Sequence, residues 1–386
     1  MKIAHVQHPY LPGFGYQENY LPAYQEDMGH EVIIFTSTLI PPKFKEGFDA
    51  NSFPPGEYKY KGVETHRLQS WFEIKTIGDV LLQDLQLELN RFEPDVIHAH
   101  GLVSPRTFQA WRYARSQDTK LFIDVHIDNG NFSIDSVHKR VVFNIFNNII
   151  LPELSSQTTS FLTVNGYALE FLEEKTTIPK HQIAFLPLGV DRDLFSPTAK
   201  IESQVRDDLG VSQNEILLIF AGNIEPSKDM EVLLKSLATI SAEYSLLLLG
   251  TIEDDYKNDL IQLAQNLGIS SNVILHDAVS HEELSKYLNS ADVGVWPGKL
   301  GITAIEAIGT GLPLIVSDDE AMGYLVSNEN GLSFPKGDEK SLANKIQMYL
   351  KDRKLLDTHS QNAAQFARDE LYWDNIAEKS IRIYNE

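Results

Sequence analysis

The sequence predicts an α/β protein with two open, doubly wound parallel sheets in separate Rossmann-like domains. Short apolar strands alternate with helix-length amphipathic segments along the chain, a pattern typical of parallel α/β sheets. The chain has 386 residues, more than one hydrophobic core usually supports. Because the alternation restarts after the stretch GVDRDLFSPTAK, we expect a first domain over 1–192 and a second over 193–370.

The first domain contains the strand and helix patterns of one complete sheet. Its predicted strands are 2–7, 31–37, 95–100, 120–126, 160–165 and 182–188. Between these strands, amphipathic patterns predict helices near 18–28, 78–92, 104–117, 137–154 and 166–174.

The second domain repeats the alternation. Its predicted strands are 215–223, 244–250, 272–277, 293–298, 312–317 and 331–335. Ligands of open parallel sheets bind outside the carboxyl ends of the strands. We therefore expect the chemistry in loops that leave these strand ends, around a crevice that the two sheets share.

Composition excludes several classes of function. The chain has no cysteine, so it has no disulfide, thiol nucleophile or thiolate metal site. A formal net charge of -21 argues against nucleic acid as a partner, since phosphate binding needs clustered lysine and arginine. The first residues, MKIAHVQHPY, lack the apolar core of a signal peptide, and we expect a cytoplasmic protein.

Two glycines follow the first strand, in the stretch YLPGFGYQEN. Gly13 and Gly15 permit positive φ and close backbone approach, and the amides at the following helix start favour an anion. An ordinary tight turn explains the same residues equally well.

Histidines gather at strand ends of the first domain. In DVIHAHG, alternation along the strand places His98 and His100 on the same face. His126 ends the next strand and precedes Asp128, within a stretch of short polar groups suited to binding hydroxyls. A site role is favoured for His126 over a packing role, while a His–His–Asp metal site is less favoured because no tight ligand spacing is present.

The second domain offers a lysine and a carboxylate at strand ends. Lys228 begins an amphipathic helix, where acids are usually preferred, so we expect it to contact phosphate. Glu306 stands between the apolar positions of a short helix in WPGKLGITAIEAIGTGLP. It is either a charge favoured near a helix start or an acceptor for a ribose diol, and spacing alone does not decide between them.

Taken together, these segments resemble the glycosyltransferases of family 4, which have the GT-B fold. The resemblance runs through YLPAYQEDMGHEVIIFTS, PDVIHAHG, IPKHQIAFLPLGVDRDLF, GNIEPSKDMEVLLKSL and SNVILHDAVSHEELSKYLNSADVGVWPG, in the family's order. It implies two facing Rossmann-like domains, with a closing helix over about 371–386 that returns to the first.

The resemblance also implies residue roles. Lys228 matches the lysine that holds the donor diphosphate, and Glu306 matches the second carboxylate of a Glu-x7-Glu motif, which binds ribose. Two positions depart from the pattern, because Asn223 stands in place of arginine and Gly298 in place of the first glutamate. We expect Lys299 and the amides of residues 299 to 302 to compensate, so that diphosphate binding survives with altered recognition of the sugar.

From the resemblance we expect His126, Lys228 and Glu306 to be catalytic, without a metal or other cofactor. The donor, a nucleotide-sugar, is a substrate. The expected donor-binding residues are Gly13, Gly15, Gly222, Asn223, Lys228, Leu275, His276, Lys299, Gly301, Ile302, Thr303 and Glu306, and those on the acceptor side are His100, Asp128 and Arg106.

The predicted function is retaining transfer of a hexose-type sugar, from a UDP-sugar first and a GDP-sugar next, to a glycan or lipid-linked acceptor. A nucleotide-sugar-binding partner without turnover and a sugar-nucleotide epimerase are the alternatives. Peripheral contact with the cytoplasmic membrane face is an open possibility, because bases concentrate on the first domain, namely Arg106, Arg112, Arg115, Lys120, Lys139 and Arg140. Helix 137–154 has apolar positions for such contact, although a buried core helix explains them as well.

Overall fold

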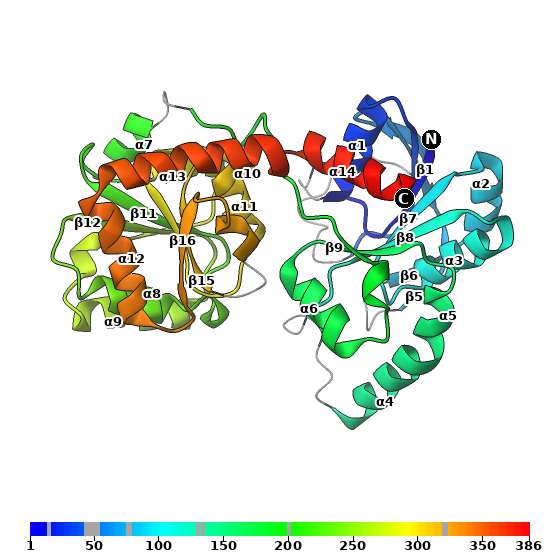
Figure 1. Ribbon diagram of the computed structural model, residues 1–386, viewed down its shortest axis with the longest axis horizontal. Coiled ribbons are helices and arrows are strands. Elements are labelled where there is room, and N and C mark those ends of the chain that lie inside the picture. Colours follow the sequence, from blue (N-terminus) through cyan, green and yellow to red (C-terminus); the bar gives the residue numbers. More distant parts are fainter. Residues whose placement is uncertain are drawn as a thin grey trace. The chain divides into compact units, whose positions relative to one another are not determined.

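A computed structural model describes residues 1–13, 17–41, 55–74, 79–128, 132, 136–198, 202–318 and 323–386. The chain divides into two compact units (Figure 1). Unit 1 comprises Met1–Pro187 with Trp373–Glu386, and unit 2 comprises Leu188–Tyr372.

Unit 1 is built on an eight-stranded sheet in the order β10-β9-β8-β7-β1-β2-β4-β3, parallel except for the β3–β4 pair. The central strands are buried along nearly their whole length, which explains their continuous apolar runs. The six strands predicted here are all present at nearly the predicted bounds. The strands are β1 (Lys2–Val6), β2 (Glu31–Ser37), β3 (Gly56–Tyr60), β4 (Val63–Leu68), β7 (Val96–His100), β8 (Lys120–Val125), β9 (Ser160–Thr163) and β10 (Ile183–Phe185).

The segment between β4 and α2 differs from the sequence prediction. The predicted helix 78–92 begins only at Leu85, because β6 (Asp79–Leu82) pairs antiparallel with β5 (Ser70–Ile74). Within β6, Val80 and Leu82 are fully buried, so burial of alternate residues in a short hairpin replaces the expected first helical turns.

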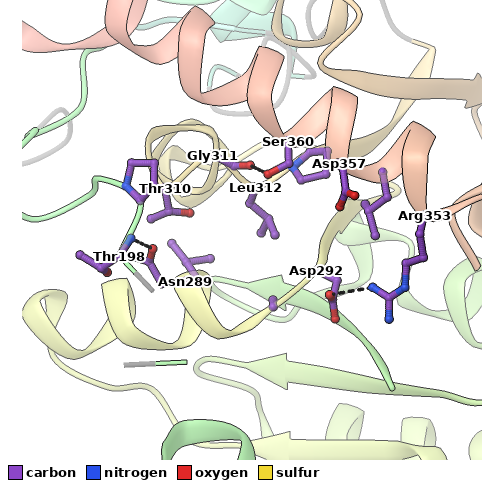
Figure 2. Close-up of a pocket in the computed structure, with 14 residues that line it drawn as sticks. Thr198, Asn289, Asp292, Thr310, Gly311, Leu312, Arg353, Asp357 and Ser360 are labelled. Carbon is purple, nitrogen blue, oxygen red and sulfur yellow. Dashed lines mark hydrogen bonds and ion pairs between the residues drawn. The ribbon is translucent and has the colours of Figure 1, made fainter. Parts of the chain in front are cut away.

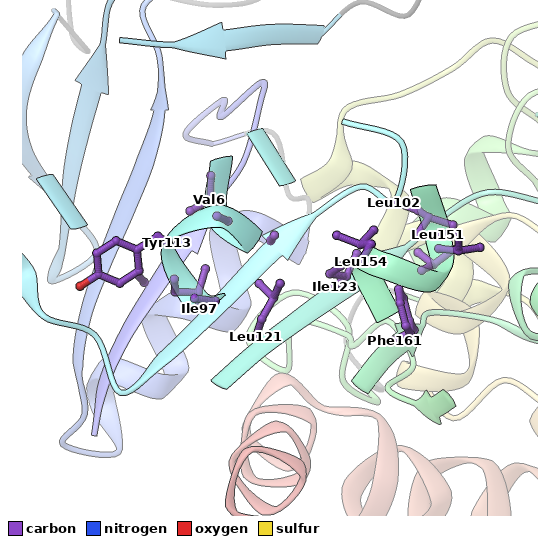
Figure 3. Packing of buried hydrophobic residues seen from close by; sticks show 14 of the residues in the cluster. Val6, Ile97, Leu102, Tyr113, Leu121, Ile123, Leu151, Leu154 and Phe161 are labelled. Atoms are coloured by element: carbon purple, nitrogen blue, oxygen red, sulfur yellow. The ribbon is translucent and has the colours of Figure 1, made fainter. Parts of the chain in front are cut away.

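The helices of unit 1 pack their apolar residues against the sheet. Figure 3 shows Leu151 and Leu154 of α5 packed beside Ile123 and Phe161 of the strands. The helices of unit 1 are α1 (Gln17–Asp27), α2 (Leu85–Phe92), α3 (Pro105–Gln117), α4 (Val137–Ile145), α5 (Leu151–Ser155), α6 (Gly166–Lys175) and α14 (Trp373–Asn385), with a π-helical segment η2 (Phe146–Ile150) and a 3-10 turn η3 (Lys180–Gln182).

The C-terminal helix α14 belongs to unit 1 and packs against α1. The rings of Tyr20 and Trp373 stack with centroids 5.5 Å apart. Tyr384 is buried at the other end of α14, against Phe122 of β8. The end of the chain therefore closes one face of the first sheet.

Unit 2 contains an all-parallel six-stranded sheet in the order β13-β12-β11-β14-β15-β16. Its strands are β11 (Ile216–Ala221), β12 (Tyr244–Leu249), β13 (Val273–His276), β14 (Val293–Trp296), β15 (Leu314–Asp318) and β16 (Gly331–Pro335). Its helices are α7 (Glu202–Asp208), α8 (Met230–Leu237), α9 (Asp254–Asn266), α10 (His281–Ser290), α11 (Ile302–Gly309), α12 (Glu339–Lys351) and α13 (Arg353–Phe366), with shorter turns η4 (Pro226–Lys228), η5 (Ser270–Asn272), η6 (Gly323–Val326) and η7 (Ala367–Leu371).

Candidate functional site

The carboxyl ends of the central strands of unit 2 approach one another closely. A Cβ added at Gly250, after β12, would lie 1.7 Å from the carbonyl oxygen of Gly222, after β11. Both glycines have positive φ, 152° and 135°. The chain thus uses two glycines to bring two loops together at the strand ends, where ligands of parallel sheets bind.

Lys228 lies at this edge, in the turn η4 between β11 and α8. It is 9% exposed, and its Nζ donates a hydrogen bond to the carbonyl oxygen of Lys299 at 2.9 Å. Burial lowers the pKa of Lys228, the charge of Lys299 lowers it further, and the carboxylate of Glu225 opposes both effects. One ammonium is therefore held at a fixed place beside the loop that follows β14.

Gly298 in that loop is packed against the backbone of η4. A Cβ there would lie 2.4 Å from the carbonyl oxygen of Ser227 and 2.5 Å from the carbonyl carbon of Lys228. The amide of Lys299 donates to the oxygen of Ser227 at 2.9 Å, so the expectation that this amide is open to a donor is wrong. The position of the missing carboxylate is occupied by main chain.

Asn223 is held by two neighbours. Its Nδ2 donates to Glu225 Oε2 at 3.1 Å, and its Oδ1 accepts from Thr251 Oγ1 at 2.8 Å. The amide therefore bridges the loops after β11 and β12 and also contacts Glu225, the carboxylate near Lys228. Compared with an arginine at the same position, this arrangement offers less positive charge to a diphosphate.

Glu306 lies inside α11 and is 6% exposed. Its Oε1 accepts from His281 Nε2 at 2.6 Å, whereas its Oε2 is buried without a hydrogen-bond partner among the described residues. The hydrogen bond to Glu306 raises the pKa of His281, against the opposing effect of burial. His281 was not among the predicted site residues, although it begins α10 in the quoted stretch VSHEELSKY.

The start of α11 is tied to β11. Gly301 is its N-cap residue, and Ile302 is 41% exposed at its first position. Thr303 donates its hydroxyl to the carbonyl oxygen of Ala221 at 2.6 Å. The hydroxyl hydrogen of Thr303 is thus used within unit 2, where it fixes the helix start beside Gly222.

Leu275 and His276, two of the expected donor-binding residues, lie at the end of β13. His276 Nδ1 donates to the carbonyl oxygen of Asp277 at 2.8 Å, and its Nε2 lies 3.0 Å from the hydroxyl of Tyr287. The carbonyl oxygen of His276 accepts from the amide of Gly250 at 3.0 Å. Leu275 pairs with Leu248 in the sheet. Leu275 and His276 thus lie at the carboxyl end of β13.

A second polar cluster lies in unit 1, at the carboxyl ends of β1, β7 and β8. As predicted from alternation, His98 and His100 share a face, and their rings stack with centroids 4.4 Å apart. Asp124 Oδ2 lies 3.1 Å from both His100 Nδ1 and His126 Nε2. His5 Nδ1 lies 3.1 Å from His100 Nε2. Neither His5 nor Asp124 was predicted as a site residue.

The pKa values of two groups in this cluster, His126 and Asp124, are shifted in opposite directions. Burial lowers the pKa of His126, but the charge and hydrogen bond of Asp124 outweigh that effect and raise it to about 9. Burial raises the pKa of Asp124, yet His126 and His100 together hold it well below its usual value. The side chain of His126 is 42% exposed and that of Asp124 is 1% exposed. A buried carboxylate therefore supports a half-exposed, charged imidazole.

The remaining predicted residues of unit 1 have varied surroundings. Gly13 has a φ of 87° and donates its amide to Asn19 Oδ1 at 3.0 Å, whereas Gly15 lies outside the described residues. Arg106 is 3% exposed, pairs with Asp79 at 3.1 Å and donates to the carbonyl oxygens of His8 and His100. Asp128 is 5% exposed. Arg106 thus has internal partners for its guanidinium.

Ligand atoms of His100, Asp124 and His126 lie within 4.8 Å of one another, as do those of His5, His98 and His100. These groups are close enough to share either protons or one ion. The contacts between Asp124 and its two histidine neighbours have hydrogen-bond lengths. Of the two, the contact between Asp124 and His126 meets the geometry of a hydrogen bond.

Unit 2 contains a pocket of about 400 Å³ whose lining includes none of the predicted donor-binding residues. Its lining includes Asp292, which precedes β14, and Pro313, which precedes β15, so it is at the amino ends of these strands. Figure 2 shows Arg353 paired with Asp292, Thr198 with Asn289, and Ser360 with Gly311. We assign it no role in the chemistry.

Two protein-family models match the chain. A model described as Glycosyl transferases group 1 matches residues 202–366, and one described as Glycosyltransferase Family 4 matches residues 20–194. Together they span most of both units.

Known proteins of similar sequence are glycosyltransferases. An uncharacterized glycosyltransferase from Methanocaldococcus jannaschii is 26% identical over 213 residues, which is 53% of this chain and 54% of that protein. A D-inositol 3-phosphate glycosyltransferase from Stackebrandtia nassauensis is 24% identical, over 93% of this chain and 83% of that protein. The chain spans about half the length of the first curated relatives it matches.

Two solved structures illustrate that the fold is a known one. A glycosyltransferase from Rickettsia africae has a TM-score of 0.73 at 16% identity and covers 100% of this chain and 97% of its own. HepE from Anabaena, solved in complex with UDP, has a TM-score of 0.71 at 17% identity and covers 100% of both chains.

Proposed function

The chain belongs to the family 4 glycosyltransferases and has their GT-B fold, and from this premise we propose that it transfers a hexose-type sugar from a nucleoside diphosphate to an acceptor hydroxyl, with retention of configuration. The acceptor in this proposal is a glycan or a lipid-linked glycan. A UDP-sugar is our first choice of donor and a GDP-sugar the second. The complex of HepE with UDP supports that order.

The observation that carries the proposal is the carboxylate of Glu306. It is 6% exposed, one of its oxygens is fixed by His281, and the other has no hydrogen-bond partner among the described residues. An unsatisfied buried carboxylate oxygen costs free energy unless a ligand supplies a donor. A ribose hydroxyl is such a donor, and the resemblance assigns ribose to this residue.

Lys228 has the complementary role. In transfer, the bond between the anomeric carbon and the diphosphate breaks, and negative charge develops on the diphosphate. A fixed ammonium beside amides at strand ends stabilises such charge without reorganising. Lys299, in the loop that follows β14, supplies a second cation near Lys228. We propose that the reaction needs no metal ion.

In this proposal, residues of unit 1 contact the donor sugar and the acceptor. His126 contacts the sugar of the donor, and Gly13 lines the diphosphate. His100 and Asp128 belong to the acceptor side. Arg106 supports that side from within, because its guanidinium bonds to main-chain oxygens of His8 and His100.

A lipid-linked acceptor is supported by the surface of α4 and η2, although the predicted basic surface is partly wrong. Of the bases named for it, Arg106 is buried against Asp79, Arg115 pairs with Glu153, and Lys120 donates to the carbonyl oxygen of Tyr384.

The apolar side chains of α4 and η2 do reach the surface. Exposed fractions are 77% for Val137, 52% for Val141, 65% for Val142, 48% for Ile145 and 68% for Ile149.

Turnover tests the proposal directly. The protein is incubated with UDP-glucose, UDP-N-acetylglucosamine or GDP-mannose, and the anomer of the released or transferred sugar is followed by proton NMR. We expect one donor to be consumed and its α-anomer to form first. Binding of a nucleotide without consumption of any sugar donor would favour the inactive binding partner, and first formation of the β-anomer would contradict retention.

A further inference from the structure

The direction of each hydrogen bond between α14 and the histidine cluster follows from its neighbours. Ser380 Oγ donates to the carbonyl oxygen of Ala377 at 2.7 Å, so this hydroxyl can only accept from Gln25, whose Nε2 lies 2.8 Å away. The other end of the amide, Gln25 Oε1, is then the acceptor that faces His5 Nε2 at 2.8 Å. His5 must carry its proton on Nε2.

The same reasoning continues to His100. His5 is fully buried, and burial together with the charge of His100 lowers its pKa to about 3, so its ring is neutral near neutral pH. With its proton on Nε2, a neutral His5 offers Nδ1 only as an acceptor. His100 Nε2, at 3.1 Å, must therefore be the donor.

This leaves the second nitrogen of His100 beside an anion. His100 Nδ1 lies 3.1 Å from Asp124 Oδ2. The same oxygen, Asp124 Oδ2, lies 3.1 Å from His126 Nε2 and accepts its hydrogen bond, so this buried carboxylate contacts both rings.

We propose that Asp124 is a positioning residue for sugar transfer, which holds His126 in one orientation and in its charged form, and which itself lies against His100 and the network to α14. This inference rests on the proposed function, since His126 is the residue assigned to the donor. A charged, fixed imidazole donates a hydrogen bond to an oxygen of the donor without reorganising.

Other charged groups near His126 are consistent with this assignment. His98 stacks on His100 and has its Nδ1 2.7 Å from the hydroxyl of Tyr384. The pKa of His98 is well below its ordinary value, chiefly because of burial, so it adds no charge. Glu18 of α1 adds to the negative potential at His126. Asp124 is thus the carboxylate in contact with the ring, and Glu18 acts on it through the electric field.

The first test replaces the carboxylate by an isosteric amide. In Asp124→Asn we expect kcat to fall by about 100-fold with a small change in the donor KM, which is the lower end of the range for a positioned acid or base. The alkaline limb of the rate profile should move from near pH 9 toward pH 6.5, and Asp124→Glu should restore part of the activity. Equal pH profiles for the wild type and Asp124→Asn would overturn the proposal.

A matched control removes a similar contact elsewhere in unit 1. Glu88 is 8% exposed, and its Oε2 lies 3.2 Å from His66 Nδ1, another buried carboxylate–histidine pair. Glu88→Gln should lower thermal stability while leaving the pH profile of transfer unchanged. A shift of the profile in this variant as large as in Asp124→Asn would assign the effect to general destabilisation and would also overturn the proposal.

The second test does not depend on turnover, so it separates this inference from the proposed function. Two-dimensional NMR of protein with ¹⁵N-labelled histidine reports the tautomer and charge of each ring. At pH 7.5 we expect an imidazolium signal for His126, assigned by its loss in His126→Gln, and loss of that charge in Asp124→Asn. A neutral His126 in the wild type, or one tightly bound metal ion per chain that a chelator removes, would contradict the proposal.

Discussion

Gly298 shows how one residue couples the donor loop to its neighbour. A Cβ at this position would meet main-chain atoms of Ser227 and Lys228 at 2.4–2.5 Å, which no rotamer change can relieve. Restoring a glutamate here would therefore not restore a carboxylate clamp. The chain has a different local packing, in which Lys228 Nζ and the amide of Lys299 each bond across the same two loops.

We predict that Gly298→Ala lowers the free energy of unfolding by about 1–3 kcal/mol, the range found for overpacking, and that Gly298→Glu lowers it further without increasing donor affinity. Urea denaturation followed by circular dichroism measures the change. Gly323→Ala is the control, because a Cβ there meets nothing within 4 Å. Equal unfolding midpoints for Gly298→Ala and the wild type would refute the packing argument.

The sequence was informative about some site residues and silent about others. Lys228 and Glu306 stood out because each interrupts a pattern, an expected acid in one case and an apolar helix face in the other. His281 contacts Glu306 and Asp124 contacts His100, which are residues distant in sequence, and one sequence does not reveal such pairs. The use of the Lys299 amide by Ser227 was hidden for the same reason. The contact of Asp124 with His126 joins residues only two positions apart, and the spacing Asp-x-His was the signal that could have shown it.

Among the elements, α4 exposes the aliphatic side chains of Val137, Val141, Val142 and Ile145 and buries Phe143. The sequence predicted one helix over 137–154, but the structure divides it into α4, the π-helical η2 and α5, which join the core at Phe143, at Phe146, and at Leu151 and Leu154. Figure 1 shows α4 extending away from the sheet of its own unit. Acidic residues are absent from 136–152, in a chain of net charge -21.

We predict that this face binds membranes containing anionic lipid, through aliphatic insertion and through Lys139 and Arg140. The variant Val141→Ser with Ile145→Ser should reduce flotation with phosphatidylglycerol vesicles at least fivefold. Ile261→Ser with Met348→Ser, a change of two exposed apolar residues in unit 2, is the control. Retained flotation in the α4 variant, or no flotation of the wild type, would remove support for a membrane-bound acceptor. None of the helices in the described ranges has the length and apolar character of a membrane span.

The elements also show where sequence patterns stop being sufficient. Parallel strands buried on both faces were predicted well, because their apolar runs are continuous. The hairpin β5–β6 was taken in part for a helix, since Val80 and Leu82 alternate over only four residues. A strand as short as β6 is stable only when it pairs with another strand. The sequence pattern did not predict its partner, β5.

For the chain as a whole, the stability of the fold should depend on pH through histidines whose pKa values are shifted in opposite directions. His5 of unit 1 has its pKa lowered to about 3, first by burial and then by the charge of His100. A depressed folded-state pKa stabilises the fold above the unfolded value of about 6.5, and this contribution is lost as the pH falls toward 3. His126 has the opposite sign, since its raised pKa contributes stability below pH 6.5 that is lost as the pH rises toward 9.

We predict that mild acid opens unit 1 before unit 2. Each pH unit below 6.5 costs the fold about 1.4 kcal/mol through His5 alone. Hydrogen exchange at pH 5 and pH 7.5, corrected for intrinsic rates, should show greater loss of protection in β1, β7 and α14 than in β11 and β12. His5→Gln should flatten this dependence. An equal loss of protection in both units would argue against the assignment.

Calorimetric titration with UDP, GDP and ADP is the most direct measurement of the proposed donor site. We expect one nucleotide to bind, and its affinity to fall at least tenfold in both Lys228→Ala and Glu306→Ala, consistent with loss of a hydrogen bond to a charged group. Lys235→Ala, which removes an exposed lysine paired with Glu339, should bind like the wild type. Unchanged affinity in both site variants, or no binding of any of the three nucleotides, would contradict the assignment of the donor to Lys228 and Glu306.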